Sequence, residues 1–233
     1  MKIDLHCHTV ASIDCLTPLL LFPERCRKQD IRVQAITDHD EVWGAQKLQE
    51  MVLEATETAE LPLLPLTIIV GEEVTTLEGE IIGLFLQEKV PPGLPAVETV
   101  ARIKQQGGLV LLPHGFDPLK YGRLQPKALQ QVADDIDIVE TFNARVSFQR
   151  YNRAAEIWAK AHNLVTSAGT DAHRLADVGV AWAEVPDQPI NKPADLLKVL
   201  HESEIVGQWT NPVLAFIKKM IDQGKQRIRE MRQ

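Results

Sequence analysis

Short runs of apolar residues recur along the chain, each brief enough for a buried β-strand. They are rich in Val, Ile and Leu and show little polar alternation, as expected for strands covered on both faces. The predicted strands are residues 2–7, 31–37, 66–70, 81–86, 109–112, 136–140 and 164–168. The chain is therefore expected to build one sheet from many short strands.

Between these runs, apolar residues recur every three or four positions, which is the spacing of an amphipathic helix. Residues 41–60 are an example, with Val42, Ala45, Leu48, Val52 and Ala55 on one face. Further helices are predicted from Thr17-Pro18 with a bend at Pro23, and over residues 96–106, 126–133, 145–161, 193–201 and 212–232. The alternation of strands and helices predicts an α/β fold with a mostly parallel sheet. Only the strands 66–70 and 81–86, which a turn at Glu78-Gly79 separates, are expected to form a hairpin.

Composition narrows this picture. The 233 residues, 45% of them hydrophobic, suit a single domain spanning residues 1–233. The formal net charge of -7 disfavours a broad face for binding nucleic acid. Three cysteines without a Cys-x-x-Cys pair, and a start in which acidic and histidine residues interrupt any apolar run, indicate a cytoplasmic protein with no membrane partner.

Metal-binding residue types follow the predicted strands. His6 and His8 are two positions apart in an extended segment, so both imidazoles face the same side. The other residues at or just beyond strand ends are His39, Glu73, His114, Arg145, Asp171 and His173. In a closed parallel barrel these ends converge on one rim, where barrel enzymes place their chemistry. His162 and His201 fall within predicted helices and are expected to play ordinary surface roles.

The order of these motifs resembles that of the PHP (polymerase and histidinol phosphatase) superfamily. The matching segments are His6-x-His8, the Asp14 loop, Thr37-Asp38-His39-Asp40, Gly71-Glu72-Glu73, Pro113-His114, Glu140-Thr141-Phe142-Asn143-Ala144-Arg145 and Gly169-Thr170-Asp171-Ala172-His173. The resemblance covers residues 4 to about 180. It implies a distorted seven-stranded β/α (TIM-like) barrel, two or three divalent ions of zinc, manganese or iron, and hydrolysis of phosphoesters.

The resemblance also implies a set of ligands. One ion would be held by His6, His8 and Asp171, with Glu73 bridging to a second ion on His114. A third ion would lie between Asp14, His39 and His173. Mixed imidazole and carboxylate donors suit hydrolytic transition metals.

The chain departs from the family pattern at two places. Glu80 stands where many members have a histidine, and it is either an oxygen ligand of the second ion or the mark of a weaker site. The acidic residue of the first loop, Asp14, comes one position later than usual. Of the two adjacent glutamates, the family register selects Glu73, and Glu72 should face the other way by strand alternation.

The metal cluster suggests a mechanism in which a metal-bound hydroxide attacks phosphorus. Glu73 would organise the ions, while Arg145, with Asn143 beside it, would bind the substrate's phosphoryl group because a guanidinium matches phosphate geometry. Asp38 and Asp40 are expected to orient other groups or cap a helix, since carboxylates behind a metal site commonly orient its histidines. No general acid stands out.

The resemblance implies that the branch of the family that cleaves nucleotides and oligonucleotides carries an inserted helical domain, and the short connection between residues 86 and 109 leaves no room for one. Together with the negative net charge, this favours a small phosphomonoester as substrate. The runner-up is a nuclease or phosphodiesterase, whose basic C-terminal segment would touch a nucleic-acid backbone. That segment contains Lys218, Lys219, Lys225, Arg227, Arg229 and Arg232. A non-catalytic metal-binding regulatory module is the alternative from another class, and it would need a site closed to water and substrate.

Overall fold

The computed structural model describes residues 1–58, 65–211, 213–214, 216–218, 220–221 and 224. Its strands are β1 (Lys2–Asp4), β2 (Ile31–Ile36), β3 (Thr67–Thr76), β4 (Gly79–Leu84), β5 (Leu109–Leu112), β6 (Ile138–Asn143), β7 (Val165–Gly169), β8 (Ala181–Glu184) and β9 (Glu204–Gly207). Its α-helices are α1 (Phe22–Gln29), α2 (Trp43–Thr58), α3 (Ala96–Gln105), α4 (Pro126–Val132), α5 (Gln149–Ala161) and α6 (Pro193–Leu200). Short 3-10 helices are η1 (Leu19–Leu21), η2 (Ala133–Asp135) and η3 (Leu175–Asp177).

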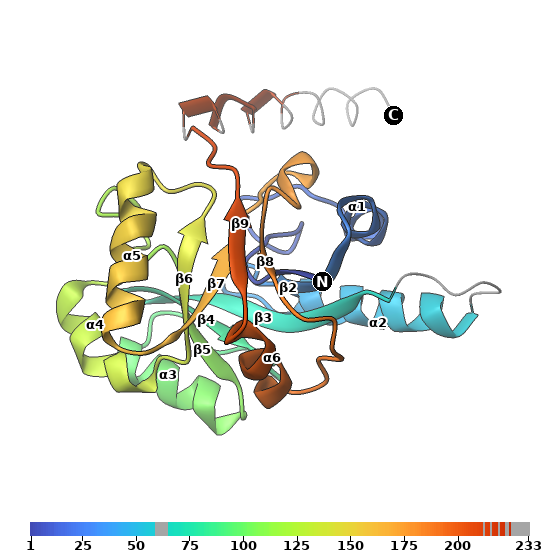
Figure 1. Ribbon diagram of the computed structural model, residues 1–233. Helices are drawn as coiled ribbons and strands as arrows, with labels where there is room; N and C mark the ends of the chain where they lie inside the picture. The colour runs from blue at the N-terminus through green and yellow to red at the C-terminus, as the bar shows by residue number, and fades with distance from the viewer. Residues whose placement is uncertain (59–64, 212, 215, 219, 222–223, 225–233) are drawn as a thin grey trace.

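The described strands form one sheet in the order β7-β6-β5-β4-β3-β2-β1-β8-β9 (Figure 1). The pairs β1–β2, β2–β3, β5–β6 and β6–β7 are parallel, whereas β4 runs antiparallel to both of its neighbours. The predicted hairpin of β3 and β4 is thus confirmed. Gly79 makes its turn with a φ of 130°, a conformation that favours glycine.

The segment that follows β1 lies against β7 and the segment that follows it, which gives the sheet its barrel-like form. Beyond β1, the Leu5 amide donates to the Ala168 carbonyl at 3.3 Å, and the Asp171 amide donates to the His6 carbonyl at 2.9 Å. Cys7 and Ala172 form a further parallel bridge. The predicted α/β barrel is confirmed in class, and the segments after the first and seventh strands lie side by side.

The expected count of seven strands is wrong, because the described sheet has nine. β8 pairs antiparallel with β1, and β9 pairs antiparallel with β8. Both added strands have only four residues. Unlike β5, which is equally short but wholly apolar, β8 ends in Glu184 and β9 begins at Glu204, so neither gives a strand signal of its own. They are strands because β8 pairs with β1 and β9 pairs with β8.

Neighbouring residues of a strand face two different apolar cores. Ile81 belongs to a cluster formed with helix residues such as Leu48 and Ile103, outside the sheet. Ile82 belongs to the second cluster, inside it, which includes Ile3 and Leu196 of α6. The apolar runs of the sequence are therefore explained by burial on both faces.

Several boundaries differ from those expected. β3 continues through Glu73, because it pairs with β4 along its second half. α5 begins at Gln149 and leaves Arg145 in a loop. Pro23 lies in the first turn of α1, after η1, where proline is well tolerated. Most of the helix predicted for residues 212–232 lies outside the described residues.

The described helices include none that combines the length and apolar character needed to cross a membrane.

Candidate metal centre

The histidines of the first motif lie directly after β1, and neither has exposed surface. Their Nε2 atoms are 3.2 Å apart, so the two rings point to a shared position. The His6 amide is fixed by the Asp4 carboxylate, which also accepts from Thr170 beyond β7. Burial raises the pKa of Asp4 to about 6.

Candidate ligands gather in three overlapping groups. One contains His6, His8 and Asp171; the second contains His6, Glu73 and His114; the third contains His8, His39 and His173. Within each group, the ligand atoms lie within 4.8 Å of one another. The structure therefore brings the strand-end residues together at one rim, although they come from five separate segments.

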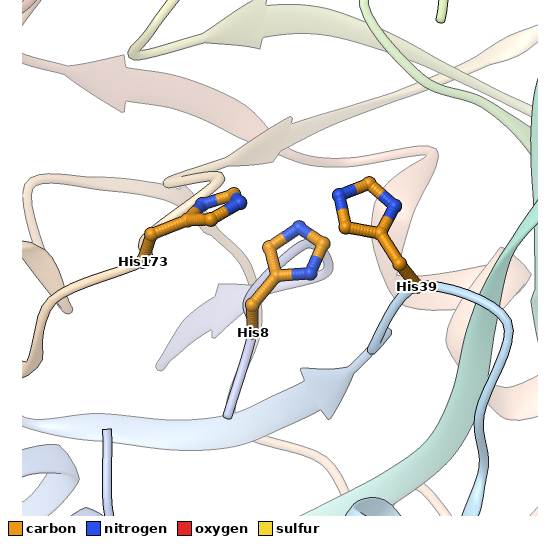
Figure 2. Close-up of side chains that lie close together, drawn as sticks. All are labelled: His8, His39 and His173. Carbon is orange, nitrogen blue, oxygen red and sulfur yellow. The ribbon is translucent and has the colours of Figure 1, made fainter. Parts of the chain in front are cut away.

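The third group is the outermost. Figure 2 shows the ring of His8 between those of His39 and His173, with centroid separations of 4.5 and 4.2 Å. Asp14 joins it, since its Oδ2 lies 2.9 Å from Nε2 of His173. Burial lowers the pKa of His173 to about 3, which keeps this imidazole neutral and able to bind a cation.

Glu73 occupies the middle of the cluster. Its Oε2 lies 3.2, 3.3 and 3.4 Å from nitrogens of His6, His8 and His39, and its Oε1 lies 2.9 Å from Nε2 of His114. Burial opposes its ionisation, but the imidazoles of His6 and His39 outweigh burial and hold the pKa of Glu73 well below its usual range. A carboxylate with one oxygen toward each side can bridge two cations.

The neighbouring Glu72 faces away, as alternation along the strand predicts. Its Oε2 accepts a hydrogen bond from the Val90 amide at 2.7 Å. Burial raises the pKa of Glu72 to about 7. Glu72 therefore belongs to the packing between β3 and the following loop, and not to the cluster.

Glu80 on β4 also reaches the cluster. Its carboxylate oxygens lie 3.6 Å from Nε2 of His114 and 3.8 Å from Nδ1 of His39. Burial and the Glu73 carboxylate raise the pKa of Glu80 to about 8. Gly122 covers this side chain so closely that a Cβ there would overlap the carboxylate.

Asp171 meets the predicted phosphate-binding residues. Arg145 donates from Nη1 to the Asp171 carbonyl at 2.8 Å and to its Oδ1 at 3.2 Å, and also contacts Nδ1 of His173. Asn143 donates to Oδ2 of Asp171 at 3.3 Å. Burial opposes ionisation here too, but Lys120 and Arg145 hold the pKa of Asp171 well below its usual range.

A buried carboxylate that was not predicted as part of the site, Glu140 of β6, supports the ligands from behind. Its Oε1 lies 2.9 Å from Nδ1 of His6, and its Oε2 accepts from the His114 amide at 2.7 Å. Although burial disfavours the imidazolium, Glu73 and Glu140 raise the pKa of His6 well above its usual value. The sequence signal was present, because Glu140 opens a motif used for the resemblance.

Asp38 and Asp40 take different supporting roles. Asp38 accepts from the Thr9 amide at 2.5 Å and from Ser12 Oγ at 2.9 Å, and Ser12 Oγ lies 3.0 Å from Nδ1 of His8. Asp40 instead accepts from the Thr75 amide at 2.7 Å and ties its loop to β3.

Lys120 and Asp117 of the loop after β5 were also missed. Lys120 Nζ forms an ion pair with Oδ2 of Asp171, while Asp117 has no exposed surface. They lie inside a long loop without periodicity, so no signal in the sequence marks them. The histidines excluded from the site, His162 and His201, are both exposed, and His162 stacks on Trp158.

The donor set fits divalent metal ions. Five imidazoles and the carboxylates of Asp14, Glu73, Glu80 and Asp171 face one another, with ring nitrogens opposing ring nitrogens. Neutral imidazole and carboxylate together suit zinc, manganese or iron, and second contacts such as Glu140 to His6 are typical of metal-bound histidines. Bound metal ions would neutralise the carboxylates, whose negative charge burial otherwise disfavours.

Two sequence comparisons match this chain to known proteins. Residues 149–205 match the family model described as PHP-associated. An uncharacterized protein of Methanocaldococcus jannaschii, MJ0417, is 34% identical over 202 residues, which cover 84% of this chain and 75% of that protein.

Solved structures share the fold at low identity. PsfC from Pseudomonas syringae has a TM-score of 0.69 at 19% identity, covering 94% of this chain and 97% of its own. A two-domain protein from Bacteroides vulgatus, containing a predicted PHP-like metal-dependent phosphoesterase, has a TM-score of 0.65 at 17% identity, covering 94% and 69%. The lesion-specific endonuclease PfuEndoQ from Pyrococcus furiosus has a TM-score of 0.54 at 15% identity, covering 88% and 57%.

Proposed function

This chain belongs to the PHP (polymerase and histidinol phosphatase) superfamily, and from that premise we propose that it is a metal-dependent phosphoesterase that hydrolyses a small phosphomonoester. The observation that carries the proposal is the overlap of three candidate ligand groups beside a guanidinium. A cluster of this kind pairs cation sites with a group suited to a phosphoryl anion.

The residues assigned to the ions follow the three groups. His6, His8 and Asp171 would hold the first ion, Glu73 would bridge to a second on His114 and Glu80, and His39, His173 and Asp14 would hold a third. When bound, such ions would lower the pKa of water and offset negative charge on the phosphoryl oxygens.

The protein's own groups position the reactants. Arg145 lies in a loop with its guanidinium at the edge of the cluster, where it would bind two phosphoryl oxygens. Asn143 fixes this loop, because its Oδ1 accepts from the Arg145 amide at 2.8 Å. In the reaction, a water oxygen bonds to phosphorus, the ester P–O bond breaks, and the water proton ends on the leaving alcohol.

The short connection between β4 and β5 and the net charge of the chain support a small substrate. The segment between β4 and β5 contains a single helix, α3, among the described residues, and no inserted domain stands over the centre. The net charge of -7 would repel a long polyanion.

A nuclease or phosphodiesterase acting on nucleotides or short oligonucleotides is the second candidate function. It is supported by the fold that this chain shares with the endonuclease PfuEndoQ. Of the basic C-terminal residues invoked for it, only Lys218 lies within the described residues. A regulatory metal-binding module without turnover is the third, and loaded protein without hydrolysis would support it.

The test is phosphate release by purified protein of known metal content. Small phosphomonoesters, phosphodiesters and short oligonucleotides would be offered with manganese and zinc separately. We expect turnover of one small monoester, abolished by His8→Ala and by Asp171→Ala but retained by His162→Ala, whose ring lies away from the cluster. Cleavage of oligonucleotides alone would favour the nuclease, and near-normal activity of both ligand variants would refute the ligand assignment.

A further inference from the structure

The loop between β5 and α4, residues 113–125, brings a second cation to the centre. Lys120 Nζ contacts Oδ2 of Asp171, and the Lys120 side chain is 22% exposed. Arg145 contacts Oδ1 of the same carboxylate at 3.2 Å from the loop after β6. One candidate metal ligand thus receives a cation on each of its oxygens, which is unusual for a group expected to hold a metal ion.

A buried carboxylate joins the two cationic loops. Asp117 Oδ2 accepts a hydrogen bond from the Ser147 amide at 2.6 Å, and its Oδ1 accepts from the Leu119 amide at 3.0 Å. Ser147 lies two residues beyond Arg145, and Leu119 precedes Lys120. Asp117 has no exposed surface, and these amides satisfy both oxygens of its buried carboxylate. Lys120 and Arg145 are therefore positioned by one shared anchor.

The far side of the Lys120 loop is fixed as well. The Glu80 amide donates to the Gly122 carbonyl at 2.7 Å, and the Gln125 amide donates to the Glu78 carbonyl at 2.8 Å. The loop is thus attached to the β3–β4 hairpin on one side and to the Arg145 loop on the other. Lys120 can rotate its side chain while its backbone stays in place.

In the described part of the chain, five carboxylates surround the histidines of the centre. The carboxylates that contact its histidines are those of Asp14, Glu73, Glu80, Glu140 and Asp171. By formal charge, these five carboxylates and Asp117 count -6, so two divalent ions together with Lys120 and Arg145 bring the sum to about 0, and three ions bring it to about +2. Once Asp171 binds an ion, its oxygens no longer need two cationic partners. A dianionic group would balance the charge that remains with three ions, and Lys120 and Arg145 would both be able to contact it.

We propose that Lys120 is the second phosphoryl-binding cation of this site, opposite Arg145, and that Asp117 is the positioning residue that holds both. The inference rests on the proposed function and deepens it, because it assigns two cations to the phosphoryl group. A phosphomonoester carries two charges and three terminal oxygens, so it can engage both cations and the ions at once. A phosphodiester offers one charge and fewer free oxygens.

The experiment titrates orthophosphate into manganese-loaded protein by calorimetry, with the metal content of every sample measured by mass spectrometry. We expect Lys120→Ala to keep its metal and to weaken orthophosphate binding roughly 10- to 100-fold, the loss typical of a charge-assisted hydrogen bond. Lys120→Arg should recover much of the affinity. Lys47→Ala is the matched control, since Lys47 is an exposed surface lysine of α2.

The positioning role of Asp117 is tested by the coupling between substitutions of Asp117 and Lys120 in orthophosphate binding, and not by the stability of the variants. In the Asp117→Ala background, adding Lys120→Ala should cost much less affinity than it does in the wild type, and Asp117→Asn should be intermediate because it keeps one acceptor. An anchor that only stabilises the fold would leave the cost of Lys120→Ala unchanged, and that result would overturn its positioning role.

Other outcomes separate this inference from the proposed function. If the wild type hydrolyses an ester but Lys120→Ala binds orthophosphate equally well, the role of Lys120 is refuted while the function stands. If Lys120→Ala loses metal instead, Lys120 serves Asp171 and the inference fails. Wild-type protein that loads metal yet neither binds orthophosphate nor hydrolyses any ester would overturn both.

Discussion

Glu140 holds two candidate ligands from behind the cluster, through Nδ1 of His6 and the backbone amide of His114. A hydrogen bond to the far nitrogen fixes which ring nitrogen faces the metal and increases its basicity. The Asp38–Ser12 pair acts on His8 in the same way. The affinity of the centre should therefore depend on residues that never touch an ion.

Glu140→Gln tests this dependence. An amide NH₂ would face donors that the carboxylate now accepts from, so we expect metal affinity to fall roughly 10- to 100-fold with the fold retained. Competition with a chromogenic chelator measures the affinity. Glu156→Gln on the exposed face of α5 should change nothing. Unaltered affinity in Glu140→Gln would show that the contact behind His6 is dispensable.

Cys7, Cys15 and Cys26 are buried free thiols. Burial raises the pKa of Cys15 to about 11 and that of Cys26 to about 12, and it raises that of Cys7 well above its usual value. Because only the thiolate reacts, native protein at pH 8 should resist iodoacetamide, and denatured protein should take up three labels by mass spectrometry. Fast labelling of the native state would contradict this burial.

At the scale of elements, β3 presents two adjacent glutamates to opposite environments, and only Glu73 faces the cluster. Glu72 has an ordinary pKa near 4.5 that burial raises to about 7 in the folded protein. The folded state therefore holds this proton more tightly than the unfolded chain does. The stability gained by protonation is complete below about pH 4.5 and is lost as the pH rises through about 7.

Glu72→Gln should remove this loss, since a neutral amide still accepts from the Val90 amide. In chelator-treated protein, we expect the variant and the wild type to be similar at pH 4.5. By pH 8 the variant should be more stable by up to about 3 kcal/mol, the free energy of a shift of this size. Urea denaturation across pH measures the difference. A gap that shrinks as the pH rises would have the wrong sign for a buried carboxyl.

The β3–β4 turn offers a second test of an element. A Cβ at Gly79 would lie 2.6 Å from backbone atoms of Arg123 and Leu124, and the φ of 130° is itself strained for other residues. Gly79→Ala should therefore lower the free energy of unfolding by about 2 kcal/mol or more. Gly93→Ala is the matched control, because Gly93 has a positive φ of 74° but open space around it, and should cost only about 1 kcal/mol. Equal losses in urea denaturation would mean that overlap with the Arg123 loop is unimportant.

At the scale of the whole molecule, the centre joins the segment after β1 to the segment after β7. His6 and His8 lie on one side of that junction, and Asp171 and His173 on the other. Ions that bind only the folded chain stabilise it by about 4 kcal/mol when present at 1,000 times their dissociation constant. Metal is thus expected to hold the barrel closed as well as to serve the chemistry.

Chelation should accordingly lower the melting temperature, and titrating manganese back should raise it in proportion to the logarithm of free metal. Differential scanning fluorimetry measures both. Asp171→Asn, which weakens one ligand, should shift the response to higher metal concentrations. A melting temperature that ignores metal would separate the centre from the stability of the fold.

Periodicity and strand-end residues predicted the parallel framework, the hairpin and the residues that meet at one rim. Each feature that the sequence pattern did not predict has a physical cause. β8 and β9 are short and not wholly apolar, and they exist because β8 pairs with β1 and β9 pairs with β8. Lys120 and Asp117 act from a loop whose path is set by contacts with the hairpin and with Ser147. Glu140 opens the motif that ends at Arg145, yet only the fold shows that it supports His6.

Because the site joins the segments that follow the first and seventh strands, it can form only after both segments have been synthesised. His6 and Asp171 are 165 positions apart in the sequence. At about 5–20 residues per second, a ribosome needs on the order of 10 s after making the first histidines before it adds the last ligands. The nascent chain thus carries an incomplete set of the candidate metal-binding histidines throughout most of its synthesis. Binding of metal by the full candidate centre would therefore come late in synthesis, and a chain that stalls before β7 is made could not assemble that centre.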